Sequence, residues 1–235
     1  MLQTAPSSPS TALRLAVFDV DGTLIDSQNS IVSAMSHAWQ SHGLVPPERA
    51  TTLRMVGLPL AEVIAGLAPG ESPERWESLR TSYSSEWSRM RDQGRLSEPL
   101  FPGAISVLDD LEEAGWLLGV ATGKSRRGLD MVLAAHGLAD RFVTLQTSDV
   151  SAGKPNPEML MKAMAETGAA PASTAMIGDT TYDVQMARNA GIHAIGVAWG
   201  YHDVSELKAA GAHAIIDDFS ELPGILDGLM AEAVR

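Results

Sequence analysis

From Pro102 to the end of the chain, short apolar runs of strand length alternate with segments of helical periodicity. This alternation constrains the fold most, because strands separated by helices pair as a parallel sheet covered by helices on both faces. We therefore predict an α/β fold. The predicted strands are 13–18, 116–121, 142–145, 175–177, 194–197 and 214–216. The predicted helices between them are 104–114, 125–136, 157–167, 182–190 and 204–210, with a last helix from about 221.

Residues 27–96 interrupt this pattern after the first predicted strand. Apolar residues such as Ile31, Met35 and Ala38 recur there at helical intervals, and five prolines divide the region into several helices. We predict a core domain formed by 13–26 and 97–235, with an all-helical domain of 27–96 inserted into it. The first twelve residues are rich in Ser, Pro and Thr, which predicts a flexible tail over 1–12.

Charge and composition exclude several classes of function. The formal net charge is −12, which disfavours nucleic acid as a partner, because such binding depends on Lys and Arg neutralising phosphates. The chain has no cysteine, so disulfides, thiolate nucleophiles and cysteine-based zinc sites are excluded. We find no apolar run of bilayer length and no signal-type segment, so we expect no membrane association and a cytoplasmic protein.

Polar side chains follow four of the predicted strands, at the point where each strand ends. Because a parallel sheet binds ligands outside the carboxyl ends of its strands, we expect these side chains to form one site. The candidate site residues are Asp19, Asp21, Thr122, Gly123, Lys154, Asp179 and Asp183.

Asp19 and Asp21 stand two residues apart, directly after the first strand and before Gly22. Such a pair can divide the work of phosphate chemistry. One carboxylate attacks phosphorus as a nucleophile, and the other protonates the leaving oxygen and later activates water. The alternative is a polar turn, for which Asp-Gly is a common sequence.

Asp179 and Asp183 follow the fourth strand and start the next helix. Carboxylate oxygens suit Mg²⁺, which takes one or two protein carboxylates together with water and substrate oxygens. The alternative is that Asp179 caps the helix and Asp183 is an acid favoured by the helix dipole.

A cluster of carboxylates needs positive charge before it can accept a phosphate. Mg²⁺ and Lys154 would supply that charge, and Thr122 with the backbone N–H groups beside it would add phosphate donors. The alternatives are a solvent-exposed lysine in a turn and an ordinary helix cap.

The ordered motifs together resemble those of the haloacid dehalogenase-like hydrolase superfamily. They are Asp19-Val20-Asp21-Gly22-Thr23-Leu24, Thr122, Lys154-Pro155 and Gly178-Asp179-Thr180-Thr181-Tyr182-Asp183. The resemblance runs from about Arg14 to the end of the chain. It implies a Rossmann-like parallel core and identifies the inserted helical domain as a cap over the site.

The resemblance also implies a role for each motif residue. Asp19 would be the nucleophile and Asp21 the general acid and base. Mg²⁺ would bind the Asp19 side chain, the Asp21 carbonyl and Asp179, with Asp183 as a ligand or a support through water. The phosphoryl group would bind Thr122, Gly123 and Lys154.

Within the superfamily, two features select the reaction class. The dehalogenase branch lacks an acid at the position of Asp21, and the phosphonate-cleaving branch uses a cap lysine, whereas residues 27–91 contain none. The chain is most similar to the group of phosphoglycolate phosphatase, so we expect hydrolysis of small phosphorylated metabolites. A β-phosphoglucomutase-like phosphosugar mutase and a non-catalytic phospho-ligand binding module stay open as alternatives.

Other residues receive weaker interpretations. Arg54 in the cap segment is equally well interpreted as a contact to the leaving group or as an exposed helix arginine. Lys124 fits a solvated helix face better than the rim of the site. The six histidines lack metal-ligand spacing and are interpreted as ordinary surface or loop residues. The sequence leaves monomer and homodimer both open.

Overall fold

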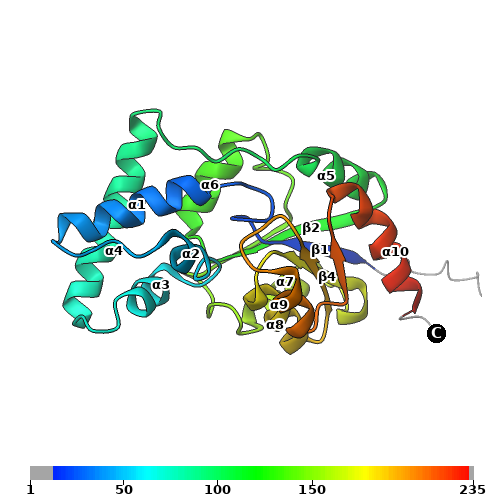
Figure 1. Cartoon of the computed structure of the whole chain (residues 1–235). Helices are drawn as coiled ribbons and strands as arrows, with labels where there is room; N and C mark the ends of the chain where they lie inside the picture. Colours follow the sequence, from blue (N-terminus) through cyan, green and yellow to red (C-terminus); the bar gives the residue numbers. More distant parts are fainter. Residues whose placement is uncertain (1–12, 233–235) are drawn as a thin grey trace, which may run out of the picture.

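Six parallel strands form one sheet in the order β3-β2-β1-β4-β5-β6, in a computed structural model that describes residues 13–232 (Figure 1). The predicted tail over 1–12 lies outside the described residues. The α/β fold with a Rossmann-like parallel sheet is confirmed. The strands are β1 (Arg14–Phe18), β2 (Trp116–Thr122), β3 (Thr144–Thr147), β4 (Thr174–Gly178), β5 (His193–Val197) and β6 (Ala214–Ile216).

Helices cover both faces of the sheet because its strands are apolar on both sides. In β1, Leu15 and Val17 pack with α7, α8 and α9, whereas Ala16 and Phe18 pack with α5, α6 and α10. All four side chains are fully buried, as a doubly covered parallel sheet requires. The helices are α5 (Ala104–Glu113), α6 (Arg126–Ala135), α7 (Glu158–Thr167), α8 (Thr181–Ala190), α9 (Val204–Ala209) and α10 (Leu222–Glu232).

A group of helices, here named the helical insert (28–92), lies between β1 and α5 in the chain and beside one end of the sheet (Figure 1). It has its own apolar core, to which Met35, Trp39, Ile64 and Leu79 contribute. Its helices are α1 (Gln28–Ser41), α2 (Arg49–Leu53), α3 (Leu60–Leu67) and α4 (Pro73–Asp92). The boundaries of 27–96 as a separate domain stay a prediction.

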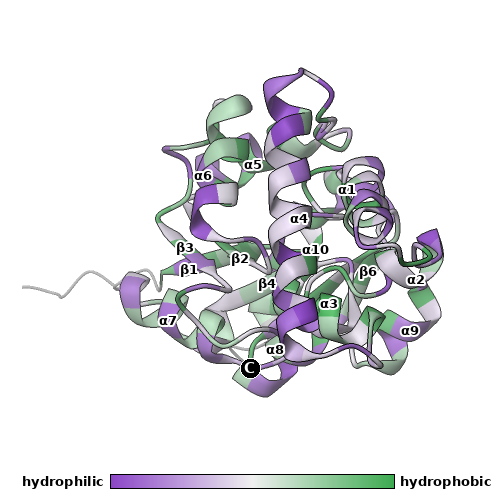
Figure 2. Cartoon of the chain, turned by 90° about the vertical axis from the view of Figure 1, so that its left-hand side faces the viewer, coloured by the Kyte–Doolittle hydropathy of each residue, from purple (hydrophilic) through white to green (hydrophobic). Residues whose placement is uncertain are grey.

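Helix α4 is the longest element of the insert and is largely hydrophilic. Ser72 caps it by accepting a hydrogen bond from Arg75 N, and Pro73 occupies its first turn, where no N–H partner is needed. Figure 2 shows α4 mainly in purple and white, so only a few of its residues are apolar. Leu79 and Met90 are buried, and Tyr83 and Trp87 line a cavity between the insert and the sheet.

The third strand begins two residues later than the sequence pattern indicates. The apolar pair Phe142 and Val143 was included in the predicted strand 142–145, but pairing with β2 starts at Thr144 opposite Gly119. Phe142 is buried in the core before the strand starts, whereas Val143 is 58% exposed. Hydrophobicity alone therefore cannot separate this core-packing loop from the strand.

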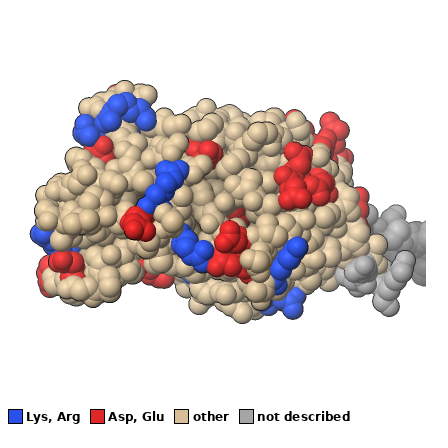
Figure 3. Space-filling view, viewed as in Figure 1, with Lys and Arg blue, Asp and Glu red and all other residues tan. Residues whose placement is uncertain are grey.

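On the face shown in Figure 3, lysine and arginine side chains lie scattered among aspartate and glutamate rather than in one basic patch. This distribution agrees with the acidic composition. None of the helices within residues 13–232 combines the length and apolarity that crossing a bilayer requires.

Candidate active site

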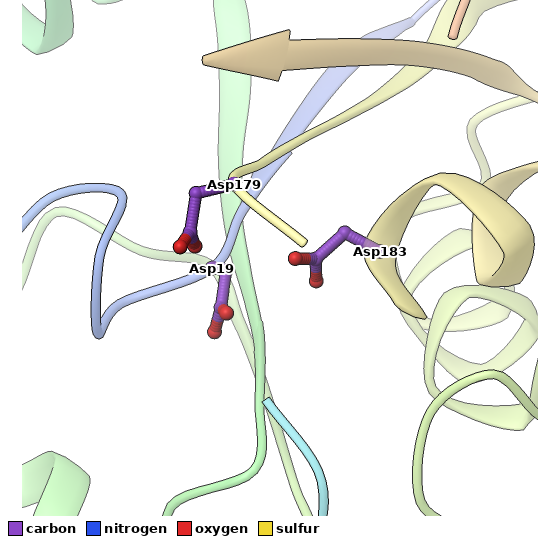
Figure 4. A group of neighbouring side chains, drawn as sticks. All are labelled: Asp19, Asp179 and Asp183. Carbon is purple, nitrogen blue, oxygen red and sulfur yellow. The ribbon is translucent and has the colours of Figure 1, made fainter. Parts of the chain in front are cut away.

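The carboxyl ends of adjacent strands bring three aspartates together. Asp19 follows β1 and Asp179 follows β4, its neighbour in the sheet, while Asp183 lies in the first turn of α8. The Asp19 N–H donates to the carbonyl of Ile177 at 2.9 Å, which fixes the two strand ends against each other. The three carboxylates lie near one another, with Asp183 extending toward the other two, and each offers an oxygen within 4.8 Å of the others (Figure 4).

Lys154 reaches this cluster from the loop after β3. Its Nζ lies 2.8 Å from Asp19 Oδ2 and 2.6 Å from Asp183 Oδ1, and its side chain is fully buried. Burial alone would lower the pKa of Lys154, but the carboxylates of Asp183 and Asp19 raise it above the usual value for lysine. Lys154 is therefore a fixed positive charge in the site rather than the solvent-exposed lysine that the sequence also allowed.

Asp183 is held from both sides. Its Oδ2 accepts hydrogen bonds from the N–H and Oγ1 of Thr180, at 3.0 and 2.6 Å, which completes the capping box of α8. Its Oδ1 is paired with Lys154. Asp183 thus serves both as a capping acid and as a charged partner within the site.

Asp179 is not the cap of α8, because Thr180 occupies that position. Instead its Oδ1 accepts from Thr23 Oγ1 at 3.0 Å, and its Oδ2 accepts from the Tyr201 N–H at 2.9 Å. Gly22, at φ +84°, leaves room for this carboxylate, since a Cβ at Gly22 would lie 2.7 Å from Asp179 Cγ. The interpretation of Asp179 as a mere helix cap is therefore wrong.

The cluster has more negative charge than Lys154 can offset. Burial raises the pKa of Asp19 to about 7, and the charge of Asp183 adds to this effect. Burial, together with repulsion from Asp183 and Asp19, raises the pKa of Asp179 well above its usual value. Asp19 Oδ1 is buried and accepts no hydrogen bond from any described residue.

These features fit a divalent cation with oxygen ligands. Mg²⁺ prefers carboxylate oxygens, and a cation placed here would satisfy Asp19 Oδ1 and relieve the repulsion between Asp19 and Asp179. The donor set contains no nitrogen or sulfur, as is expected for a hard cation. The residues present therefore suit the Mg²⁺ that the sequence motifs imply.

A cavity of about 590 Å³ opens beside the cluster, between the helical insert and the ends of β1 and β2. Asp19, Asp21, Thr122 and Gly123 all line it, so the structure brings these predicted residues to one space. On the opposite wall the insert contributes mainly apolar and aromatic side chains. Among them are Ile31, Met35, Val56, Leu58, Leu60, Val63, Tyr83 and Trp87.

Gly123 has a role in packing that the sequence did not reveal. A Cβ at this position would lie 2.7 Å from the carbonyl oxygens of both Gly57 and Leu58, which belong to the loop between α2 and α3. The missing side chain therefore lets the insert rest directly on the core beside Thr122. Gly123 still lines the cavity, so this packing role is compatible with the predicted contact to phosphate.

Arg54 is not among the residues that line the cavity. Its guanidinium forms an ion pair with Glu206 of α9, with Nη1 3.1 Å from Glu206 Oε2, and its side chain is half exposed. Its carbonyl accepts hydrogen bonds from Tyr182 and His202, which tie the insert to the core. Here Arg54 joins the two parts of the molecule and does not face the site.

One interpretation from the sequence is wrong. Lys124 is not on a solvated helix face, because its side chain is only 12% exposed and pairs with Asp21 and Glu98. His202 lies in the loop between β5 and α9, but it is buried there, 5% exposed, and its Nδ1 accepts from the Thr181 N–H. One signal was available for Lys124, which stands two residues after the end of β2, among the other site residues.

Comparison with known proteins agrees with this geometry. A model of the haloacid dehalogenase-like hydrolase family matches residues 16–197. The chain is 38% identical over 220 residues to "Probable phosphatase IndB" of Dickeya dadantii, covering 92% of this chain and 94% of that protein. It is 31% identical over 241 residues to the phosphoglycolate phosphatase of Agrobacterium fabrum, covering 98% of each.

A solved structure of a hydrolase from Pseudomonas syringae has the same fold. It is 27% identical, superposes with a TM-score of 0.80, and covers 92% of this chain and 98% of its own. The family match spans most of the sheet and includes every strand end that contributes to the site. The chain therefore belongs to the haloacid dehalogenase-like hydrolase family and is a phosphoric monoester hydrolase that acts on small phosphate substrates.

Proposed function

We propose that the chain is a Mg²⁺-dependent phosphatase that hydrolyses small phosphate monoesters through an aspartyl phosphate on Asp19. The observation that carries this proposal is the buried cluster of Asp19, Asp179 and Asp183 beside Lys154, in which Asp19 Oδ1 has no hydrogen-bond partner among the described residues. A carboxylate in this position is unusually costly to bury unless a cation completes its surroundings.

In the first half-reaction, an Asp19 carboxylate oxygen forms a bond to phosphorus while the bond from phosphorus to the ester oxygen breaks. Asp21, which lines the cavity beside Asp19, gives its proton to that ester oxygen, so the alcohol leaves neutral. In the second half, Asp21 removes a proton from water, the water oxygen bonds to phosphorus, and the Asp19–phosphorus linkage breaks. The products are the alcohol and inorganic phosphate.

Asp19 and Asp179 are the residues we assign to direct contact with Mg²⁺, together with the backbone carbonyl of Asp21. We do not assign Asp183 to direct contact with the cation, because both of its oxygens already have partners in Lys154 and Thr180. It supports the site by holding Lys154. When bound, the cation supplies charge stabilisation for the phosphoryl oxygens. Lys154 adds a second positive charge there, and Thr122 and Gly123 contact the phosphoryl group from the end of β2.

The helical insert acts as a cap that limits water and selects the leaving group. The cavity of about 590 Å³ has room for a leaving group the size of a sugar as well as for glycolate. Its insert wall is mainly apolar, and Arg91 and Arg127 lie on its lining. We therefore propose phosphoglycolate-like or sugar-phosphate-like monoesters as substrates, a choice that the likeness to a phosphoglycolate phosphatase supports.

The test is release of inorganic phosphate from p-nitrophenyl phosphate and then from a panel of metabolites led by phosphoglycolate. We expect release with Mg²⁺, no release with EDTA, and no release by Asp19→Asn in either condition. Conversion of a sugar 1-phosphate to its 6-phosphate without free phosphate would support a mutase instead. Binding of phosphate esters without turnover across the panel would support a non-catalytic module.

A further inference from the structure

A second charged cluster lies on the wall of the cavity, next to the aspartate cluster. Lys124 Nζ lies 3.0 Å from Asp21 Oδ1 and 3.2 Å from Glu98 Oε1. The three side chains are between 12% and 13% exposed, so they form a nearly buried row from the linker before α5 to the catalytic loop. The sequence motifs account for Asp21 but assign nothing to Lys124 or Glu98.

Lys124 is held in place on several sides. Its backbone N–H donates to Thr122 Oγ1 at 3.3 Å, and its Nζ lies 5.0 Å from the ring centre of Trp87 in α4. The carbonyl of Glu98 is in turn bonded by His136 Nε2 at 2.7 Å, which anchors the linker to the end of α6. The ammonium group thus already faces two carboxylates and an aromatic ring, which leaves it little capacity to bind substrate.

The contacts on Asp21 are one-sided. Its Oδ1 accepts from Ser27 Oγ and lies within ion-pair distance of Lys124 Nζ. No described residue donates a hydrogen bond to its Oδ2, and the side chain lines the cavity. Two donors therefore hold Oδ1, which leaves Oδ2 available to a leaving group in the cavity.

We propose that Lys124, backed by Glu98, is the positioning residue that orients Asp21 for proton transfer from Oδ2 to the ester oxygen of the substrate. This inference rests on the proposed phosphatase function. In the step concerned, the proton moves from Asp21 Oδ2 to the ester oxygen as the phosphorus–oxygen bond breaks, and Lys124 exchanges no proton. The other possible role of Lys124 is direct contact with the substrate, since it also lines the cavity.

The basicity of the leaving group separates these two roles. p-Nitrophenolate leaves readily without a proton, whereas the alkoxide of benzyl alcohol needs one, and the two esters are similar in size. kcat/KM reports the first phosphoryl transfer, in which Asp21 acts as the acid. We expect Lys124→Met to lower kcat/KM for benzyl phosphate at least about tenfold more than for p-nitrophenyl phosphate, within the range of general acid catalysis.

Variants of the same row provide the comparison. Asp21→Asn gives the loss of kcat/KM that follows when the general acid is removed, and shows how that loss depends on the leaving group. Adding Lys124→Met to Asp21→Asn should cause little further loss, because both changes remove the same function. Glu98→Gln should also lower kcat/KM more for benzyl phosphate than for p-nitrophenyl phosphate, but by a smaller factor than Lys124→Met. Lys162→Met, which removes an exposed lysine paired with Glu158 on α7, is the matched control and should leave kcat/KM for both esters unchanged.

The outcomes distinguish the inference from the function it rests on. A wild-type protein inactive on both esters, or an active Asp19→Asn variant, refutes the phosphatase. If the wild type is active but Lys124→Met lowers kcat/KM equally for both esters, or changes KM alone, only the positioning role is refuted. If Lys124→Met does not fold, Glu98→Gln decides, because it keeps the side-chain shape. Equal losses of kcat/KM on both esters again overturn the inference.

Discussion

Asp19 is the residue whose environment is most unfavourable in the absence of a cation. Burial raises its pKa to about 7, so from about pH 4 to pH 7 the folded protein retains a proton that the unfolded chain has released. The free energy of unfolding of the metal-free protein therefore falls as the pH rises through this window. Such a destabilising charge is typical of a functional site rather than of a structural ion pair.

Replacing Asp19 with asparagine should stabilise the metal-free protein. In EDTA near pH 8, we expect Asp19→Asn to raise the free energy of unfolding by roughly 1–3 kcal/mol, and to raise it less near pH 5. Denaturant unfolding at the two pH values measures the difference, with Asp227→Asn on the surface as control. Lower stability of Asp19→Asn at both values would contradict the electrostatic account of the site.

The residues that could be recognised from the sequence share one property. Asp19, Asp179 and Lys154 all lie beyond the carboxyl end of a strand: the two aspartates directly follow the apolar strands β1 and β4, and the lysine lies in the loop after β3. A parallel sheet brings such strand ends to one edge. Lys124 also follows a strand, but its partner Glu98 lies 26 residues away in the chain, in the linker before α5, and the sequence pattern does not indicate that the two pair. Arg54 pairs with Glu206, which lies 152 residues away, and only the packing of the insert on the core brings these two residues into contact.

The role of Arg54 can be tested by mutation. Its guanidinium is half exposed and pairs with Glu206, and solvent screening leaves such surface ion pairs little effect on stability. We expect Arg54→Ala and Glu206→Ala to lower stability by similar small amounts, to be non-additive when combined, and to leave kcat/KM unchanged. A loss of kcat/KM for anionic leaving groups in Arg54→Ala alone would restore the substrate contact allowed by the sequence.

At the scale of elements, the loop between α2 and α3 sits directly on the end of β2. The loop carbonyls of Gly57 and Leu58 approach Gly123 so closely that a methyl group there would meet both oxygens at 2.7 Å. The type and order of the elements followed from periodicity, but this contact did not. A glycine beside Thr122, which we propose to bind phosphate, is equally well explained by the ligand, and the local sequence does not indicate which segment packs against it.

Gly123→Ala should therefore displace the insert. We expect a loss of about 1–3 kcal/mol in stability, as for other overpacked positions, and a fall in kcat/KM because the cavity wall shifts. Gly224→Ala is the matched control, since a Cβ there meets nothing within 4 Å and should leave stability and activity intact or slightly raise stability. A Gly123→Ala variant with unchanged kcat/KM would show that close packing of the insert on the core is not needed for turnover.

At the scale of the whole molecule, the site joins all parts of the described chain. The strand ends supply the charged groups, the insert closes the cavity, and the loop after β5 donates the Tyr201 N–H to Asp179. A ligand that binds only this assembled site stabilises the native state as a whole. The effect follows mass action and reaches about 2.7 kcal/mol at a concentration one hundred times Kd.

Mg²⁺ should therefore raise the midpoint of thermal unfolding in a concentration-dependent way. We expect the shift to disappear in Asp179→Asn, which removes one ligand, and to persist in Lys162→Met on α7. The affinity should decrease as the pH falls below about 7, since a proton then competes with the cation for Asp19. An identical shift in the wild type and Asp179→Asn would place the cation elsewhere.

Rapid acid quenching can detect the proposed covalent phosphoryl group on Asp19. A substrate carrying a radiolabelled phosphoryl group is mixed with enzyme and Mg²⁺, quenched within the first turnover and digested. We expect label on the peptide that contains Asp19, released by hydroxylamine as an acyl phosphate is, and none in Asp19→Asn. If the protein carries no label while phosphate is released, and Asp19→Asn still turns over substrate, the reaction does not pass through an aspartyl phosphate on Asp19.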